Sequence, residues 1–248
     1  MKVFCCGSCR ILESMKDRKD CEIIHNLTGT NFVGKNFLGK LHDIKCQIQL
    51  ILFLQCKISL EYDILRRFLT VFNEERWRNE IPIKNPGMVN VKIQNLINDL
   101  PQCEWYIFEI SSLKKYLYKG FPCQFEQSYD RTLSEFDIQI QTAEELYGDL
   151  EHLVSLLPNK KIIFQCHFRP NIIYGDENKR IEKRETIFNT LEKFCEGRDN
   201  IFLHDPSILI KNDHTLFDGD DSGDHFTKKG LEENEKYIYE HFLLKNDL

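Results

Sequence analysis

The sequence contains no long hydrophobic run and no excess of basic residues. Its longest apolar stretch, residues 50–54, is far shorter than the roughly 20 apolar residues that a membrane-spanning helix needs. Acidic residues outnumber basic residues by 39 to 33, which gives a net charge of -6. Proteins that bind the phosphates of nucleic acid usually have the opposite balance or a block of basic residues. We therefore expect neither a membrane nor a nucleic acid as partner, but a small molecule, a sugar or a protein.

The sequence also lacks a disulfide framework, a metal-binding motif and a signal-peptide pattern. Its ten cysteines are scattered at no repeating spacing, so we predict that most are reduced core residues. The apolar stretch at the start of the sequence is too short for the hydrophobic region of a secretory signal peptide. We therefore expect a cytoplasmic location. No second pair of cysteines or histidines accompanies Cys6 and Cys9 at zinc-ligand spacing, and we predict neither a metal nor a cofactor.

Five short apolar runs alternate with helical patterns along the chain. Near-continuous apolar runs of this kind are typical of strands that are buried on both faces of a parallel sheet. The runs comprise residues 3–6, 21–27, 105–110, 161–168 and 200–204, and the helical segments comprise residues 40–55, 60–73, 88–99, 142–156, 177–195 and 227–244. The alternation predicts right-handed βαβ units. We therefore expect one three-layer α/β/α domain over residues 1–248, with a five-stranded parallel sheet.

Local patterns define some helix ends and one long connection. Thr142 and Glu145 have the spacing of a capping box, and Thr227 can cap the last helix. Residues 30–101 form an unusually long connection between the second and third strands, and their pattern is mostly helical. We expect this segment to be a helical insertion or a cap over the ligand crevice.

The first candidate for chemistry is the segment Gly7-Ser8-Cys9-Arg10, which directly follows the first strand. Ligands of open α/β sheets bind outside the carboxyl ends of the strands, where this segment is expected to lie. A helix that begins at Ser8 would supply backbone N–H groups that stabilise a developing oxyanion. Considered alone, a Gly-Ser pair indicates a helix cap more often than a nucleophile.

The second candidate is the acidic segment 218–227, immediately before the last helix. His225 lies between carboxylates there, and this suits a general base, because a carboxylate fixes the tautomer of the imidazole. The same composition also fits a solvent-exposed turn. Asp218 and Asp220 suggest a metal-binding loop, but no glutamate occupies the twelfth position of an EF-hand, so we discount calcium.

Together, the two candidates resemble the motifs of the SGNH (GDSL-like) hydrolase superfamily. Members of that family begin with a serine after the first strand, as in Gly7-Ser8-Cys9, and end with an Asp-His pair before the last helix. The resemblance spans the chain from end to end, although its motifs are short. It implies a flavodoxin-like α/β/α fold with a Ser-His-Asp triad. Ser8 would be the nucleophile, His225 the base, and an aspartate would orient His225.

The chain departs from this family pattern at the orienting aspartate. That residue usually lies three positions before the histidine, where this chain has Ser222. Asp221 is the preferred substitute, and Asp224 and Asp220 are alternatives. The departure concerns the residue that orients the base more than the base itself.

A second departure concerns the oxyanion donors, which in the family are a glycine after the second strand and an asparagine after the third. Gly29 occupies the first place and can donate through its backbone N–H, with Asn31 close behind it. The second place holds no asparagine, so Ser111 or Ser112 would donate a hydroxyl hydrogen bond instead. The missing asparagine fits a divergent member with altered or reduced hydrolysis.

Two further polar candidates, His167 and Arg169, follow the fourth strand. Arg169 and Arg10 could each hold an anionic group such as a carboxylate or a phosphate. Arg10 could equally be a surface charge on the first helix. His167 is either a substrate-binding residue or a packed histidine with a satisfied hydrogen bond.

These candidates predict serine-dependent acyl-ester chemistry. Because relatives in the superfamily include carbohydrate O-acyltransferases and deacetylases, the resemblance implies an acylated sugar or glycan as the ester substrate. One alternative is a glycan- or nucleotide-binding module of the same fold that has lost catalysis. A further alternative is a thiol redox protein, because Cys6 and Cys9 form a C-x-x-C pair at the start of a helix.

Overall fold

The computed structural model describes residues 1–15, 21–25, 41–69, 87–123, 133–169, 181–220 and 223–245. Its centre is a sheet of five parallel strands in the order β2-β1-β3-β7-β8. The strands are β1 (Lys2–Cys6), β2 (Glu22–His25), β3 (Trp105–Ile110), β7 (Lys161–Cys166) and β8 (Ile201–His204). All five predicted strands are present, so the prediction of an α/β fold with a five-stranded parallel sheet is confirmed.

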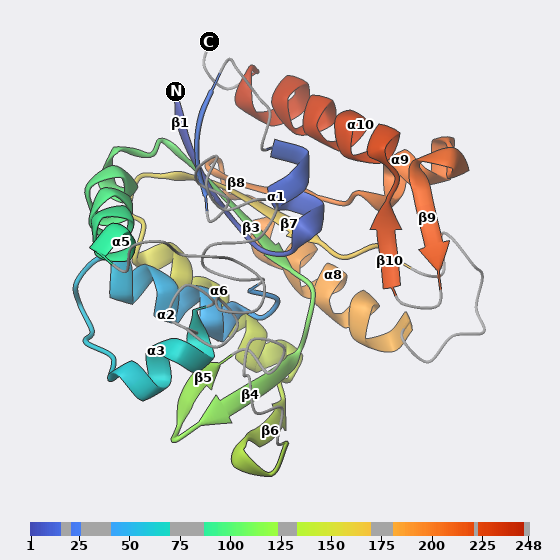
Figure 1. Cartoon of the computed structure of the whole chain (residues 1–248). Coiled ribbons are helices and arrows are strands. Elements are labelled where there is room, and N and C mark those ends of the chain that lie inside the picture. Colours follow the sequence, from blue (N-terminus) through green and yellow to red (C-terminus); the bar gives the residue numbers. More distant parts are fainter. Residues whose placement is uncertain are drawn as a thin grey trace.

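Helices cover both faces of this sheet (Figure 1). One face packs against α1 (Cys9–Met15), α10 (Lys228–Ile238) and the π-helical turn Tyr239–Leu243. The helices on the other face are α2 (Ile44–Leu54), α3 (Tyr62–Phe68), α5 (Gly87–Asp99), α6 (Ala143–Ser155) and α8 (Ile181–Cys195). Strand β3 contributes Trp105 to the hydrophobic core beneath α1 and α10, and Tyr106 to the core on the opposite face. Every residue of the strand is buried. Burial on both faces explains why the run is apolar at nearly every position.

The predicted helix caps are confirmed. Thr142 Oγ1 accepts a hydrogen bond from Glu145 N at 3.2 Å, and the Glu145 carboxylate accepts one from Thr142 N at 2.9 Å, which completes the capping box of α6. Thr227 Oγ1 accepts a hydrogen bond from Gly230 N at 3.2 Å at the start of α10. Helix α3 ends at Phe68, earlier than the predicted residue 73, because Leu69 adopts an extended conformation.

Two small sheets were not predicted. Strands β4 (Lys114–Tyr118), β5 (Phe121–Cys123) and β6 (Asp137–Ile140) form an antiparallel sheet in the order β5-β4-β6. All four residues of β6 are exposed, although residues 136–141 alternate between apolar and polar side chains as a half-buried strand does. Lys115 is buried within β4.

The second unpredicted sheet is the antiparallel hairpin of β9 (Phe217–Asp220) and β10 (Gly223–Phe226). The acidic segment that carries His225 was expected to be a loop, and most of it forms this hairpin instead. Short helices complete the described residues: η2 (Leu100–Gln102), η4 (Leu133–Glu135), α9 (Ser207–Asn212) and η5 (His214–Leu216). None of the helices in the described part of the chain is both long enough and apolar enough to cross a bilayer.

Candidate functional site

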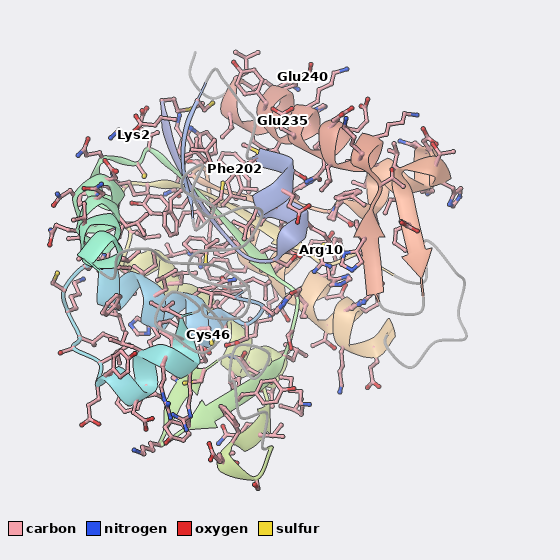
Figure 2. The ribbon with its side chains drawn as sticks, in the orientation of Figure 1. Lys2, Arg10, Cys46, Phe202, Glu235 and Glu240 are labelled. Carbon is pink, nitrogen blue, oxygen red and sulfur yellow. The ribbon has the colours of Figure 1, made fainter. Side chains whose placement is uncertain are left out.

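Polar residues gather where the parallel strands end, at what we call the carboxyl edge of the sheet. Ser8 follows β1, Ser111 follows β3, His167 follows β7 and Asp205 follows β8. Parallel strands end at the same edge, and α/β sheets bind their ligands there. Arg10 lies near the start of α1, immediately after Ser8 and Cys9 (Figure 2). The predicted segment around Ser8 therefore lies where the topology expects a ligand.

The hydroxyl of Ser8 is held by a carboxylate. Ser8 N donates to Glu109 Oε2 at 2.9 Å, and Ser8 Oγ donates to the same oxygen in a short hydrogen bond. Ser8 Oγ also accepts a hydrogen bond from Arg10 N at 3.3 Å. Ser8 is only 1% exposed and Glu109 is fully buried. Because the Ser8 N–H group already donates to Glu109, an oxyanion would need other donors in this conformation.

Arg10 neutralises the buried charge of Glu109. Arg10 Nε donates to Glu109 Oε1 at 2.6 Å, and Arg10 Nη2 lies 2.6 Å from the same oxygen. A carboxylate in a fully buried position requires an opposite charge and hydrogen bonds, and Arg10 and Ser8 supply both. Sequence analysis did not assign Glu109 a role. A single carboxylate within an otherwise apolar buried strand was the pattern that could have identified it.

Close packing of β1 against β3 makes Gly7 necessary next to Ser8. A Cβ atom on Gly7 would lie 2.5 Å from Glu109 Cβ and 2.9 Å from Ile11 Cγ2, closer than carbon atoms can approach. The absence of a side chain at Gly7 therefore lets the Ser8 backbone reach the Glu109 carboxylate.

A row of buried polar side chains crosses the sheet from Glu109. Gln165 of β7 is the register partner of Glu109, and His204 of β8 is the register partner of Gln165. His204 Nε2 lies 2.8 Å from Asn234 Oδ1, and Asn234 Nδ2 donates to Ser14 Oγ at 3.1 Å. Ser14 Oγ in turn donates to the carbonyl oxygen of residue 10 at 2.6 Å. Helix α1, which begins immediately after Ser8, is thus tied to α10 and β8 by buried hydrogen bonds.

His204 is fully enclosed in this row. Burial lowers the pKa of His204 to about 4, although its hydrogen bond to Asn234 acts in the opposite direction. The ring stacks on Tyr237 with a centroid separation of 5.1 Å. His204 is therefore neutral at pH 7 and acts as a structural element of the site.

A serine–histidine contact occurs at the carboxyl edge, immediately after β3. His42 Nδ1 lies 2.9 Å from Ser111 Oγ, and the His42 carbonyl oxygen accepts hydrogen bonds from Ser111 N at 3.0 Å and Ser112 N at 3.1 Å. Ser112 Oγ is directed to its own turn, where it accepts a hydrogen bond from Lys114 N at 2.9 Å. Sequence analysis identified Ser111 and Ser112 but not His42, because no spacing rule relates residues so far apart in the chain.

His167 is a buried, neutral histidine of the same edge. Burial lowers its pKa well below the ordinary value, and the positive charges of Arg10 and Arg184 lower it further. The ring makes a T-shaped contact with Phe168, over which the Arg10 guanidinium lies 5.7 Å from the ring centroid. A lowered pKa makes the imidazole a weak proton acceptor, which favours the interpretation of His167 as a packed histidine.

The guanidinium of Arg169 is held by acidic groups of the chain. It makes a two-pronged contact with Glu185, with Nε and Nη2 each 3.0 Å from a carboxylate oxygen, and Nη1 donates to Asp205 Oδ2 at 3.3 Å. The guanidinium also lies 3.8 Å from the centroid of the Phe188 ring. An anionic ligand would have to compete with two carboxylates for Arg169.

His225 lies on β10, opposite Asp218 of β9, and is half-buried. Among the residues that the structure describes, no hydrogen bond joins Ser8 to His225. The next residue, Phe226, packs against Phe168 with a ring separation of 4.8 Å, so the hairpin lies against the carboxyl edge. The backbone of the alternative orienting residue Asp224 belongs to β10, and its side chain is outside the described residues.

Three predicted site residues lie outside the described residues: Gly29, Asn31 and Asp221.

Of the C-x-x-C pair, Cys6 is fully buried, and burial together with the nearby Asp43 and Glu109 raises its pKa well above the ordinary value. A raised thiol pKa works against the thiolate that redox chemistry requires. The Cys9 side chain is not among those described.

The described residues contain no group of three or more His, Cys, Asp or Glu side chains arranged to hold a metal ion. The described part of the site therefore offers serine, histidine, carboxylate and guanidinium groups for chemistry.

No known family model matches the chain, and no characterised protein matches it significantly.

Proposed function

We propose that this protein performs serine-dependent acyl-ester chemistry at the carboxyl edge, with Ser8 as the nucleophile. The observation that carries the proposal is the environment of Ser8, whose hydroxyl is fixed by a buried carboxylate at the end of a central parallel strand. The strand order adds support, because it corresponds to the order 2-1-3-4-5 of flavodoxin-like sheets, the fold implied by the SGNH resemblance.

Glu109 and Arg10 prepare Ser8 for this reaction. The hydrogen bond to a carboxylate orients the Ser8 hydroxyl and increases the electron density on Oγ. Because Arg10 neutralises Glu109, the pair contributes orientation without adding an unbalanced negative charge near the oxyanion. The Ser8 proton must pass to a separate base, for which His225 is our candidate, with Asp221 or Asp224 orienting the imidazole.

The reaction then follows the usual two steps of acyl transfer. Ser8 Oγ attacks the ester carbonyl while the base takes its proton, and the tetrahedral intermediate expels the alcohol, which recovers that proton. The Gly29 N–H is a candidate oxyanion donor, and the Ser111 hydroxyl is a second one in the tautomer in which His42 Nδ1 carries the ring proton and donates to Ser111 Oγ. Water completes hydrolysis of the acyl-enzyme, as in an esterase or deacetylase, whereas a sugar hydroxyl completes transfer, as in an O-acyltransferase. An acylated sugar or glycan is the proposed substrate.

Labelling and hydrolysis test this proposal directly. We expect a fluorophosphonate probe to modify Ser8, and p-nitrophenyl acetate hydrolysis to fall at least tenfold in Ser8→Ala and in His225→Ala. Ser155→Ala and His152→Ala are matched controls, because both residues are exposed on α6, away from the carboxyl edge. Absence of a Ser8 adduct, together with unchanged hydrolysis in both site variants, would refute the proposal.

A second candidate function is binding of a glycan or nucleotide without catalysis. The observation that favours it is the 1% exposure of Ser8, whose hydroxyl already donates to Glu109. Titration calorimetry with a monoacetylated glucose, followed by mass spectrometry of the recovered sugar, separates the two functions. Binding with the acetyl ester intact supports the binding module, and loss of the acetyl group supports catalysis.

A further inference from the structure

The carboxyl edge contains a second hydroxyl that is already in contact with a histidine. Ser111 Oγ lies 2.9 Å from His42 Nδ1, and both residues are half-buried rather than enclosed. Ser8, by contrast, is 1% exposed and its hydroxyl donates to a carboxylate. A half-buried serine within hydrogen-bond distance of an imidazole has the geometry of a nucleophile with its base.

The position of His42 is fixed from several sides. Leu41 N donates to the Gly7 carbonyl oxygen at 3.2 Å, which anchors the segment to the end of β1. Gln47 Nε2 donates both to the Leu41 carbonyl oxygen at 3.0 Å and to the Glu109 carbonyl oxygen at 2.7 Å, which anchors the segment to β3. The hydrogen bonds from Ser111 N and Ser112 N to the His42 carbonyl oxygen then hold the two reacting residues together.

These contacts use backbone groups and a buried glutamine rather than the reactive atoms. The imidazole Nδ1 and the hydroxyl Oγ are therefore held at bonding distance by parts of the chain that do not change in the chemical step. Preorganisation of this kind is what a general base requires, since its geometry must be correct before the proton moves.

We propose that Ser111 and His42 form a second nucleophile–base pair that accepts acyl groups independently of Ser8. The proposal takes its substrate class, an acyl ester, from the proposed function but does not depend on the role of Ser8. The pair acts in the tautomer in which the imidazole proton is on Nε2 and Nδ1 accepts from the Ser111 hydroxyl.

The chemical step balances within the pair and the ester. Ser111 Oγ forms a bond to the carbonyl carbon, the carbonyl π electrons move to the oxygen, and the Ser111 proton passes to His42 Nδ1. Collapse of the intermediate breaks the bond to the alkoxide, which takes the proton from Nδ1 and leaves as the alcohol. Ser111 then carries the acyl group, His42 is neutral again, and water reverses the same steps to release the acid.

Peptide mapping after acylation tests the pair. The full chain is incubated with p-nitrophenyl acetate, or with a fluorophosphonate probe, and the modified serines are identified by mass spectrometry. We expect an adduct on Ser111 in the wild type and in Ser8→Ala, and none at this position in Ser111→Ala. Modification confined to Ser112, or the absence of any Ser111 adduct, would overturn the inference.

The variant His42→Asn separates proton transfer from a structural role. Its amide can keep a hydrogen bond to Ser111 Oγ but cannot take up a proton, so we expect the rate of Ser111 modification to fall about 100-fold. His152→Asn, an exposed histidine on α6, is the matched control and should leave the rate unchanged. An unchanged rate in His42→Asn would contradict the assignment of His42 as the base.

The two proposals fail in different ways in this experiment. Loss of a Ser8 adduct with a retained Ser111 adduct removes Ser8 as a nucleophile and leaves the second pair standing. A Ser8 adduct without a Ser111 adduct does the reverse. Melting curves of each variant, followed by circular dichroism, verify that the compared proteins are folded.

Discussion

The ion pair of Arg10 and Glu109 predicts a large effect of a small substitution, Glu109→Gln. The substitution keeps the shape of the side chain but removes the negative charge beside a guanidinium whose side chain is only 6% exposed. Removing one partner of a buried ion pair costs about 3–5 kcal/mol of unfolding free energy. Since domains are stable by only about 5–15 kcal/mol, this single change should remove a large part of the total.

A double-mutant cycle gives the magnitude of the coupling. Arg10→Met removes the positive charge and should also destabilise the protein strongly, whereas the double variant Arg10→Met with Glu109→Gln leaves no unbalanced charge. We expect the double variant to lose less stability than the sum of the single variants, by about 2 kcal/mol. The assay is urea unfolding at pH 7.5, followed by fluorescence, to which the buried Trp105 contributes.

The matched control is the exposed pair Lys228 and Glu232 on α10, whose side chains are 92% and 66% exposed and whose charges lie 4.0 Å apart. Alanine substitutions at these positions should show no measurable coupling, because solvent screens the pair. Interdependence of the buried pair would be refuted if the effects of Arg10→Met and Glu109→Gln were additive, so that the coupling free energy of the buried pair equalled that of the surface pair.

Three further predictions concern pH, thiol reactivity and packing. Because the pKa of His204 is lowered to about 4, the unfolded chain binds a proton more readily than the folded chain, and stability falls as the pH falls from 6.5 towards 4. Between pH 7.5 and pH 5.5 the wild type should lose about 1.3 kcal/mol more than His204→Gln in urea unfolding, and an equal loss would contradict the assignment. The buried Cys6, with its raised pKa, should resist iodoacetamide at pH 8 while the exposed Cys56 reacts, as peptide mapping can establish; equal rates at both cysteines would restore the redox alternative. Gly7→Ala should lower the unfolding free energy by about 1–3 kcal/mol because its Cβ would overlap Glu109, whereas Gly148→Ala on α6, which meets no atom within 4 Å, should not be destabilising. Similar thermal unfolding midpoints for the two alanine variants would show that the close approach at Gly7 is relieved elsewhere.

The parallel sheet could be predicted from the sequence because its strands are buried on both faces. Strand β3 was predicted with both ends correct, since its run of buried apolar residues begins at Trp105 and ends at Ile110. The sheet that contains β6 was missed although residues 136–141 alternate between apolar and polar side chains, and this alternation was the signal that could have identified the strand. Sequence analysis relied on near-continuous apolar runs, which identify strands buried on both faces of a sheet but not a short, exposed strand such as β6.

The candidate site was predictable only in part, because several of its contacts join residues far apart in the chain. The place of Ser8 follows from chain order, because the turn after the first strand of a parallel sheet must lie at the carboxyl edge. The contacts of Ser8 with Glu109 and of His42 with Ser111 join different elements of the fold, and no local spacing encodes them. Of these residues, Glu109 could have been identified most easily from the sequence, because a carboxylate in a buried strand requires a compensating charge.

The hydrogen bond from Asn234 to Ser14 has a consequence for synthesis of the chain. The two residues are 220 positions apart, so α1 leaves the ribosome long before the helix that completes its support. Contacts of such long range form late in folding and slow it, and until they form α1 lacks its packing against α10. The segment that carries Ser8 is therefore made first but acquires its final surroundings last, when residues 228–238 have emerged and docked against α1.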